Sequence, residues 1–182
     1  YKEINAETVI NELISNSSPN KEKKIFFVWP EGIIPNTYED QLDLYNDIFE
    51  KYFNENHLIG LGITSRKTIN DDYSYYNSFS IFDSQLNLID SYNKINLVPF
   101  GEFVPVENIL NKFGLKTITN NIGSFNKGDN RDIIQLKNGN KKLNFLPLIC
   151  YEIIYSGNLT KNFDFDFISV SYTHLRAHET YP

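Results

Sequence analysis

The sequence predicts a layered α/β domain, because of its composition and the order of its apolar segments. Of its 182 residues, 41% are apolar and 15% aromatic, while 22% are charged, so the chain can bury a sizeable core and is not typical of a disordered segment. Short runs rich in β-branched and aromatic residues are interrupted by a segment whose apolar residues recur at helical spacing. Strands interspersed with helices favour sheets covered by helices.

The first predicted strand is Lys24 to Trp29, a short apolar run bounded by lysines and a proline. A helix is expected next, because Thr37 offers an N-cap with Asp40 three residues later. Apolar side chains follow at helical spacing, namely Leu42, Leu44, Ile48, Phe49, Tyr52 and Phe53. This helix is expected to lead into a second strand, His57 to Thr64.

Five further strands are expected, at residues 75–82, 85–90, 132–136, 143–149 and 163–169. The first two are joined around Asp83 and Ser84, which predicts a hairpin. The third and fourth are separated by the turn sequence Asn138-Gly139-Asn140. Residues 93–101 lie between these two pairs and are expected to form a loop.

Charge, cysteine content and hydropathy exclude several classes of protein. The 17 Lys+Arg against 23 Asp+Glu give a net charge of −6, which disfavours an extended nucleic-acid surface because such a surface needs clustered cations. Cys150 is the single cysteine, so it is a buried thiol, a reactive thiol or half of an intermolecular pair. No run of consecutive apolar residues approaches the length of a membrane-spanning helix, and residues 1–11 lack the apolar segment of a signal peptide. Any attachment to a membrane must come from outside this stretch.

Three short motifs carry residues that can do chemistry. Glu31 lies in VWPEGIIP, just past a predicted strand, and Lys94 lies in YNKINLVPFGEFVP, a largely apolar, proline-pinned loop. Cys150 lies in LPLICYE, directly after another strand. The ends of strands are where sites collect in α/β sheets. Taken singly, each residue also fits an ordinary role as a loop glutamate, a surface lysine or an inert core thiol.

Together, the three residues can perform nucleophilic catalysis at a carbonyl. A free thiol is only a few per cent ionised at neutral pH, so a nucleophilic cysteine needs a base or a cation beside it. Glu31 can take the proton, in a mostly apolar pocket expected from Trp29, Ile33 and Ile34. The Lys94 ammonium can stabilise the oxyanion formed when the thiolate attacks an ester or amide. This chemistry calls for no metal or organic cofactor.

The order Glu, Lys, Cys in the contexts WPE, YxKxxLVPFGE and CYE resembles the carbon-nitrogen hydrolase (nitrilase) superfamily and, within it, the apolipoprotein N-acyltransferases. This resemblance implies a nitrilase-like αββα sandwich, truncated at its C-terminal end. It makes Cys150 the nucleophile that carries an acyl chain as a thioester, Glu31 the general base and Lys94 the oxyanion stabiliser. Four residues are expected to orient the lysine, shape the acceptor site or face the site from a strand: Glu102, Tyr151, Glu152 and Asn77, the last of which equally fits a structural amide.

The resemblance also implies a reaction and a location. An acyl chain would pass from a phospholipid, usually phosphatidylethanolamine, to the α-amino group of the N-terminal diacylglyceryl-cysteine of an apolipoprotein. The domain would lie on the periplasmic face of the bacterial inner membrane, held by transmembrane helices outside this stretch, with residues 99–105 as an apolar surface near the bilayer or as part of the core. Two alternatives are a soluble nitrilase-type amidase that hydrolyses a small amide, and a catalytically silent binding domain.

The chain is expected to divide into three parts. Residues 1–23 would be a lead-in from a missing membrane region, and residues 24–169 an incomplete catalytic domain. Residues 170–182 contain VSYTHLRAHET, which resembles the translation of a transposase adapter used in sequencing libraries, so they are expected not to be native. His174 and His178 have the spacing of a metal half-site on a helix, but they lie in this tail, and no metal site is expected.

Overall fold

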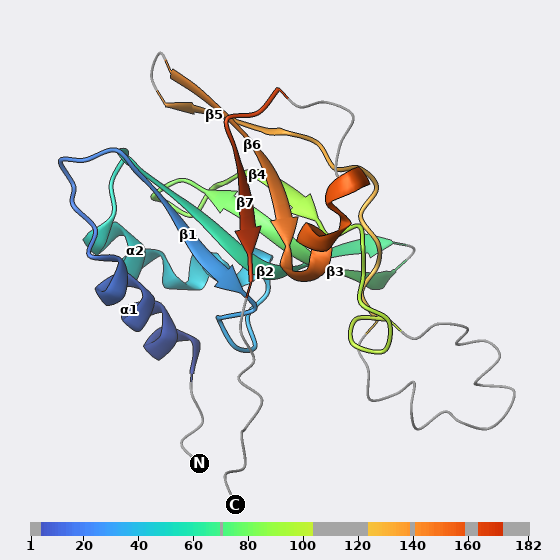
Figure 1. The fold of residues 1–182 in the computed structure, drawn as a ribbon. Helices are drawn as coiled ribbons and strands as arrows, with labels where there is room; N and C mark the ends of the chain where they lie inside the picture. The colour runs from blue at the N-terminus through green and yellow to red at the C-terminus, as the bar shows by residue number, and fades with distance from the viewer. Residues whose placement is uncertain (1–4, 70, 104–123, 139–140, 159–163, 173–182) are drawn as a thin grey trace, which may run out of the picture.

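The structure, a computed structural model, describes residues 5–69, 71–103, 124–138, 141–158 and 164–172. In this part of the chain two β-sheets face one another, and helices cover the outer face of the first sheet (Figure 1). The elements in chain order are α1 (Ala6–Ser17), β1 (Ile25–Glu31), the 3-10 helix η1 (Glu39–Tyr45), α2 (Asn46–Tyr52), β2 (His57–Ile69), β3 (Asp72–Phe82), β4 (Leu88–Asn93), β5 (Ile134–Asn138), β6 (Lys141–Ile149), the 3-10 helix η2 (Cys150–Asn158) and β7 (Phe167–Ser171).

Both sheets are mixed. In the first, the strand order is β1-β2-β3-β4, with β1 parallel to β2 and the other pairs antiparallel. In the second, the order is β5-β6-β7, with β5 antiparallel and β7 parallel to β6. The C-terminal ends of β1 and β6, each a member of a parallel pair, lead to Glu31 and Cys150. The sheet topology therefore brings two of the three candidate groups to strand ends.

The core between the sheets is made by side chains from both. Its buried members are Phe79, Ile81 and Tyr92 from the first sheet and Ile134, Leu136, Phe145 and Ile149 from the second. The two α-helices among the described residues both pack on the other face of the first sheet. The described residues thus form the α, β and β layers of the expected αββα sandwich.

Trp29, Ile33 and Ile34 belong to the helix-side core, so the prediction that they surround Glu31 is wrong. The Trp29 ring packs against Phe49 with ring centroids 5.8 Å apart, and its indole N–H donates to Ser17 Oγ at 3.0 Å. Alternation along β1 is the cause, because successive side chains of a strand point to opposite faces. Trp29 therefore faces the helices.

Helix α1 lies within the predicted lead-in and packs in the core that covers the first sheet, while the domain boundary at Lys24 stays a prediction. Asn5 caps the helix, since its side chain accepts a hydrogen bond from the Thr8 N–H at 2.8 Å. Ala6, Ile10 and Ile14 recur at helical spacing and are buried in the core that covers the first sheet. No helix among the described residues is long and apolar enough to cross a membrane.

Replacing Ile10 by alanine should therefore destabilise the domain. Ile10 has 0% of its surface exposed, so the change leaves a cavity in the core, and we expect a loss of about 2–5 kcal/mol in the free energy of unfolding. Thermal unfolding of the intact gene product, with Glu12→Ala on the exposed face of the same helix as the control, measures this effect. Equal melting temperatures for the two variants would mean that α1 does not belong to the folded domain.

The helix predicted from Thr37 is present but begins differently. The Thr37 hydroxyl donates to the Pro35 carbonyl at 3.0 Å and does not cap a helix. Tyr38 occupies the N-cap position of η1, and its N–H donates to the Gln41 side chain at 3.1 Å. The segment starts as a 3-10 helix and continues as α2.

The hairpin after β3 is displaced along the sequence from its predicted position. Asp83 Oδ1 accepts hydrogen bonds from the N–H groups of Gln85 at 2.8 Å and Asn87 at 2.9 Å, so the turn extends to Asn87 and β4 begins at Leu88 rather than at Gln85.

The later strands also differ in their bounds. β5 and β6 are confirmed as a hairpin, although β5 starts two residues later than predicted. β7 runs from Phe167 to Ser171, across the predicted native boundary at Ser169. Residues 104–105, 139–140, 163 and 173–182, with the histidines of the tail, lie outside the described residues. The adapter assignment stays a prediction.

Candidate active site

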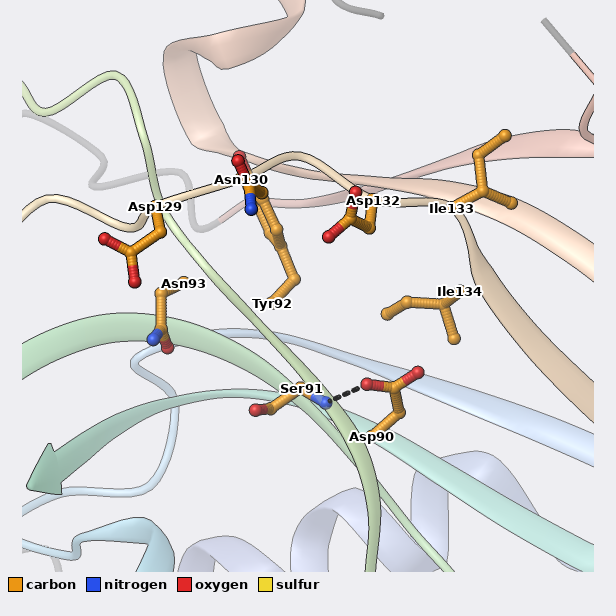
Figure 2. Close-up of a pocket in the computed structure, with 9 residues that line it drawn as sticks. All are labelled: Asp90, Ser91, Tyr92, Asn93, Asp129, Asn130, Asp132, Ile133 and Ile134. Carbon is orange, nitrogen blue, oxygen red and sulfur yellow. Dashed lines mark hydrogen bonds between the residues drawn. The ribbon is translucent and has the colours of Figure 1, made fainter. Parts of the chain in front are cut away.

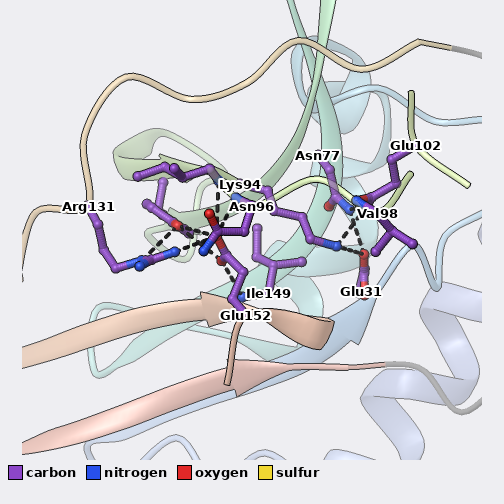
Figure 3. A network of polar contacts seen from close by, with 11 residues as sticks. Glu31, Asn77, Lys94, Asn96, Val98, Glu102, Arg131, Ile149 and Glu152 are labelled. Carbon is purple, nitrogen blue, oxygen red and sulfur yellow. Dashed lines mark hydrogen bonds and ion pairs between the residues drawn. The ribbon is translucent and has the colours of Figure 1, made fainter. Parts of the chain in front are cut away.

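The structure brings Glu31, Lys94 and Cys150 together from three strand ends. Glu31 is the last residue of β1, Lys94 directly follows β4, and Cys150 directly follows β6. Lys94 Nζ lies 3.8 Å from Glu31 Oε1, and the Glu31 carboxylate lies near enough to the Cys150 thiol to raise the pKa of that thiol. Lys94 is 1% exposed, so its ammonium sits inside the protein (Figure 3).

Specific backbone features place Glu31 and Cys150. Pro30 has no N–H for the ladder, and the pairing of β1 with β2 shifts register between Trp29 and Glu31. A Cβ at Gly62 of β2 would collide with the backbone of Glu31, so the glycine permits this close approach. Cys150 has a φ of +52°, in the left-handed region that favours glycine. Backbone of this kind in a non-glycine residue is concentrated at functional sites.

Two further residues hold the lysine. Lys94 Nζ donates to Glu102 Oε1 at 2.8 Å. The Asn77 amide donates to Glu31 Oε1 at 2.5 Å and to Glu102 Oε1 at 2.6 Å, so it bridges the two carboxylates (Figure 3). Glu102 Oε2 accepts the Val98 N–H at 2.8 Å, which ties the carboxylate to its own loop. Glu102 thus contacts the lysine directly, and Asn77 lies beside it on a strand that faces the site.

The thiol of Cys150 is held in its protonated form. Burial raises the pKa of Cys150, and the nearby Glu31 carboxylate raises it further, while the Lys94 ammonium and the Tyr151 backbone N–H act in the opposite direction. Because the net shift is upward, the thiol is neutral at physiological pH. In such an arrangement a carboxylate beside the thiol can accept its proton, and a nearby ammonium can favour the resulting thiolate.

Glu152 lies deeper than the prediction of a role at the acceptor site suggests. It is 0% exposed, and both of its carboxylate oxygens accept hydrogen bonds from inside the protein (Figure 3). The donors are the Tyr92 hydroxyl, the backbone N–H groups of Ile95, Asn96 and Ile149, and the Arg131 guanidinium. Tyr151, the residue between Cys150 and Glu152, is exposed. Of the two residues that follow the nucleophile, only Tyr151 is placed to meet a substrate.

A hollow of about 230 Å³ lies near this site but is not lined by any of the three candidate catalytic residues. Its lining comes from residues 90–93 along β4 and from residues 129–130 and 132–134, with Asp90, Asp129 and Asp132 among them (Figure 2). Among the described residues, no cluster of three or more His, Cys, Asp and Glu has an arrangement that could hold a metal ion.

A model of the carbon-nitrogen hydrolase family matches residues 21–164, which include all three candidate catalytic residues. The chain belongs to the carbon-nitrogen hydrolase family. This match also begins upstream of Lys24, and it ends before the suspected adapter.

Several curated relatives of this carbon-nitrogen hydrolase chain are named apolipoprotein N-acyltransferase. The protein from Rhizobium leguminosarum bv. trifolii is 32% identical over 144 residues, which cover 78% of this chain and 26% of the relative. That from Rhizobium rhizogenes is 35% identical over 142 residues, covering 73% and 25%. That from Agrobacterium fabrum is 43% identical over 86 residues, covering 47% and 16%. The chain therefore spans about a quarter of the length of the first two relatives.

Solved structures show the same carbon-nitrogen hydrolase fold. A superfamily protein from Xanthomonas campestris, with an arsenic adduct in its active site, matches with a TM-score of 0.54 and 12% identity over 95% of this chain and 62% of that one. Glutamine-dependent NAD+ synthetase from Acinetobacter baumannii matches with a TM-score of 0.52 and 19% identity over 93% of this chain and 30% of that one. At such identities the likeness concerns the fold alone.

Sequence reasoning missed two members of the carbon-nitrogen hydrolase site. Tyr92 and Arg131 both contact Glu152. The sequence gives a weak indication for Tyr92, because this residue precedes Lys94 by two positions and therefore points to the same face of the strand end. It gives no indication for Arg131, since the partner of Arg131 is 21 residues away along the chain.

Proposed function

We propose that this chain is the catalytic domain of an apolipoprotein N-acyltransferase, with Cys150 as nucleophile, Glu31 as general base and Lys94 as oxyanion stabiliser. The observation that carries the proposal is the convergence of these three groups, with the Glu31 carboxylate raising the pKa of the Cys150 thiol and the buried ammonium 3.8 Å from the same carboxylate. The names of the relatives support the choice of reaction.

In the first stage, the Cys150 proton moves to Glu31 as the sulfur attacks the ester carbonyl of a phospholipid. The carbonyl oxygen becomes an oxyanion, which the Lys94 ammonium stabilises. When the intermediate collapses, the C–O bond to the glycerol breaks and the leaving alkoxide takes the proton from Glu31. The products of this stage are a lysophospholipid and an acyl thioester on Cys150.

In the second stage, the α-amino group of the diacylglyceryl-cysteine attacks the thioester carbonyl. Glu31 takes a proton from the attacking amine, and Lys94 again stabilises the oxyanion. The C–S bond breaks, the thiolate recovers its proton from Glu31, and an amide is formed. Each stage uses groups of this chain alone, with a phospholipid as donor and an apolipoprotein as acceptor.

Exposed apolar side chains beside the catalytic residues support an apolar substrate. Phe100, on the loop that follows Lys94, is 63% exposed, and Tyr151, Ile153 and Ile154, directly after the nucleophile, are exposed as well. Exposed apolar groups favour a binding site for a lipid or a protein when they lie on one surface. In the proposed arrangement the domain acts on the periplasmic face of the bacterial inner membrane, where both substrates carry lipid chains.

Intact mass spectrometry on the complete gene product that contains these residues tests the proposal. After incubation with phospholipid vesicles, we expect a mass increase of one acyl chain on Cys150, removed by hydroxylamine and lost when a diacylated lipopeptide is added. Release of ammonia from small amides without an acyl adduct would instead identify an amidase. A protein with neither reaction, and with ordinary alkylation of Cys150, would be a silent binding domain.

A further inference from the structure

Arg131 lies outside the three motifs but pairs with the most buried carboxylate of the site. Its Nη2 donates to Glu152 Oε1 at 2.6 Å, and its Nε donates to the Tyr92 hydroxyl oxygen at 3.1 Å. The side chains of Arg131 and Glu152 are only 7% and 0% exposed. The guanidinium is therefore part of the internal polar network and not a surface charge (Figure 3).

Glu152 connects the two segments that carry the catalytic groups. Its Oε1 accepts the N–H groups of Ile95 and Asn96, each at 3.0 Å, which directly follow Lys94. Its Oε2 accepts the N–H of Ile149, also at 3.0 Å, which directly precedes Cys150. One carboxylate thus fixes the backbone beside the lysine and beside the nucleophile.

The segment that carries Arg131 also touches the lysine loop directly. The Gly128 N–H donates to the Lys94 carbonyl at 2.9 Å, and a Cβ at Gly128 would collide with the Asn93 carbonyl. The approach of this segment to Lys94 therefore requires glycine. Arg131 follows three residues later and reaches Glu152 from there.

From this geometry we infer that Arg131 is a positioning residue, which holds Glu152 in place so that Glu152 aligns Lys94 with Cys150. The inference rests on the proposed function, because it takes Lys94 and Cys150 as the catalytic pair. Among the described residues that bond to Glu152, every other one lies within two residues of Lys94 or Cys150, so Arg131 brings an anchor from outside the two catalytic segments.

A buried carboxylate needs a countercharge to keep its geometry. In a low-dielectric interior, an unpaired carboxylate takes up a proton or recruits water, and its hydrogen bonds to the backbone weaken. Without Arg131, the N–H groups of Ile95, Asn96 and Ile149 would lose part of their acceptor. A displacement of about 1 Å between reacting groups lowers a rate by about 100-fold, which is the effect expected on acylation.

The test uses the complete gene product and two measurements. The first is the single-turnover rate at which phospholipid acylates Cys150, followed by intact mass. We expect Arg131→Met to lower this rate by about 100-fold and Arg131→Lys, which keeps the charge but not the planar fork, to recover part of it. Arg66→Met is the matched control, because Arg66 also pairs with a carboxylate, Asp40 at 2.9 Å, but lies outside the site.

A double variant separates positioning from a loss of folded protein. Arg131→Met together with Glu152→Gln removes both charges, so no uncompensated buried charge remains. If Arg131 acts through Glu152, the double variant is no slower than the slower of the two single variants, Arg131→Met and Glu152→Gln. The inference would be overturned if the rate losses of the two single variants multiplied in the double variant, or if Arg131→Met kept the wild-type rate.

The second measurement is the pH profile of Cys150 alkylation by iodoacetamide. Since the Lys94 ammonium lowers the pKa of Cys150, a displaced lysine moves the alkylation midpoint to higher pH in Arg131→Met. A purely structural role would reduce the amount of reactive protein at an unchanged midpoint and would contradict the inference. The alkylation profile does not depend on any acyl donor, so a wild-type protein that forms no acyl-enzyme would refute the proposed function and still leave the role of Arg131 measurable.

Discussion

Replacing Cys150 by alanine should abolish the acyl-enzyme and lower the rate of transfer to a lipopeptide by on the order of 10⁴-fold or more. Cys150 is the only cysteine of the chain, so no second thiol of these residues can take over the acyl group. Glu31 and Lys94 would remain in place, but a base and an oxyanion stabiliser have nothing to activate when the nucleophile is missing. The initial rate of lipopeptide acylation and the intact mass after incubation with phospholipid measure the two losses.

Cys150→Ser is the informative partner of this variant. Serine keeps a nucleophilic atom on the same left-handed backbone, but its hydroxyl is far less acidic than a thiol, so Glu31 gives it little activation. We expect slow formation of an adduct that resists the mild hydroxylamine treatment which removes a thioester. An acyl adduct of undiminished yield in Cys150→Ala would show that the nucleophile is another residue.

The three catalytic candidates could be predicted from sequence because each stands at the end of a recognisable strand. Glu31 and Cys150 follow apolar runs, and Lys94 lies in a loop punctuated by prolines, so local pattern and motif context locate all three. Their convergence depends on the packing of the two sheets, because β1 and β4 are opposite edges of the first sheet and β6 belongs to the second. Asn77 was expected on a strand facing the site only from the family resemblance, and in the structure its amide joins Glu31 and Glu102.

Features that depend on distant partners could not be predicted in this way. Arg131 reads as an ordinary charged residue, and only the packing of its segment against Lys94 and Glu152 reveals its place. Trp29 lies in a run of residues typical of a strand, but the sequence of this run does not indicate which face of the sheet packs against the helices. Thr37 could cap a helix in principle, yet its hydroxyl bonds to Pro35 because side-chain hydrogen bonds compete locally with helix capping.

Helix α1 is a different kind of miss, because its signal is present in the sequence. Asn5, Ile10 and Ile14 give a cap and an apolar stripe. The boundary at Lys24 came from the first recognisable motif, and a motif marks where chemistry begins and not where the folded domain begins. Because this apolar stripe is buried against β1 and β2, helix α1 contributes to the stability of the domain.

Replacing Lys94 by methionine should lower the acylation rate by on the order of 100- to 1,000-fold. Methionine approximates the length of lysine but carries no charge, so the oxyanion loses its stabilising ammonium. The midpoint of Cys150 alkylation should also move to higher pH, because Lys94 is the charged side chain that lowers the pKa of Cys150 against the effects of burial and Glu31. Lys67→Met is the control, since Lys67 lies over the Tyr76 ring and away from the thiol.

The Lys94 variant also leaves Glu31 and Glu102 facing one another with only Asn77 between them, so a loss of rate could come from repulsion that distorts the site. Lys94→Met combined with Glu102→Gln removes one of the two carboxylates and relieves this repulsion. If the ammonium acts on the oxyanion, the double variant regains thermal stability and stays slow. A double variant that regained the wild-type acylation rate would mean that Lys94 only balances the charge of its two neighbours.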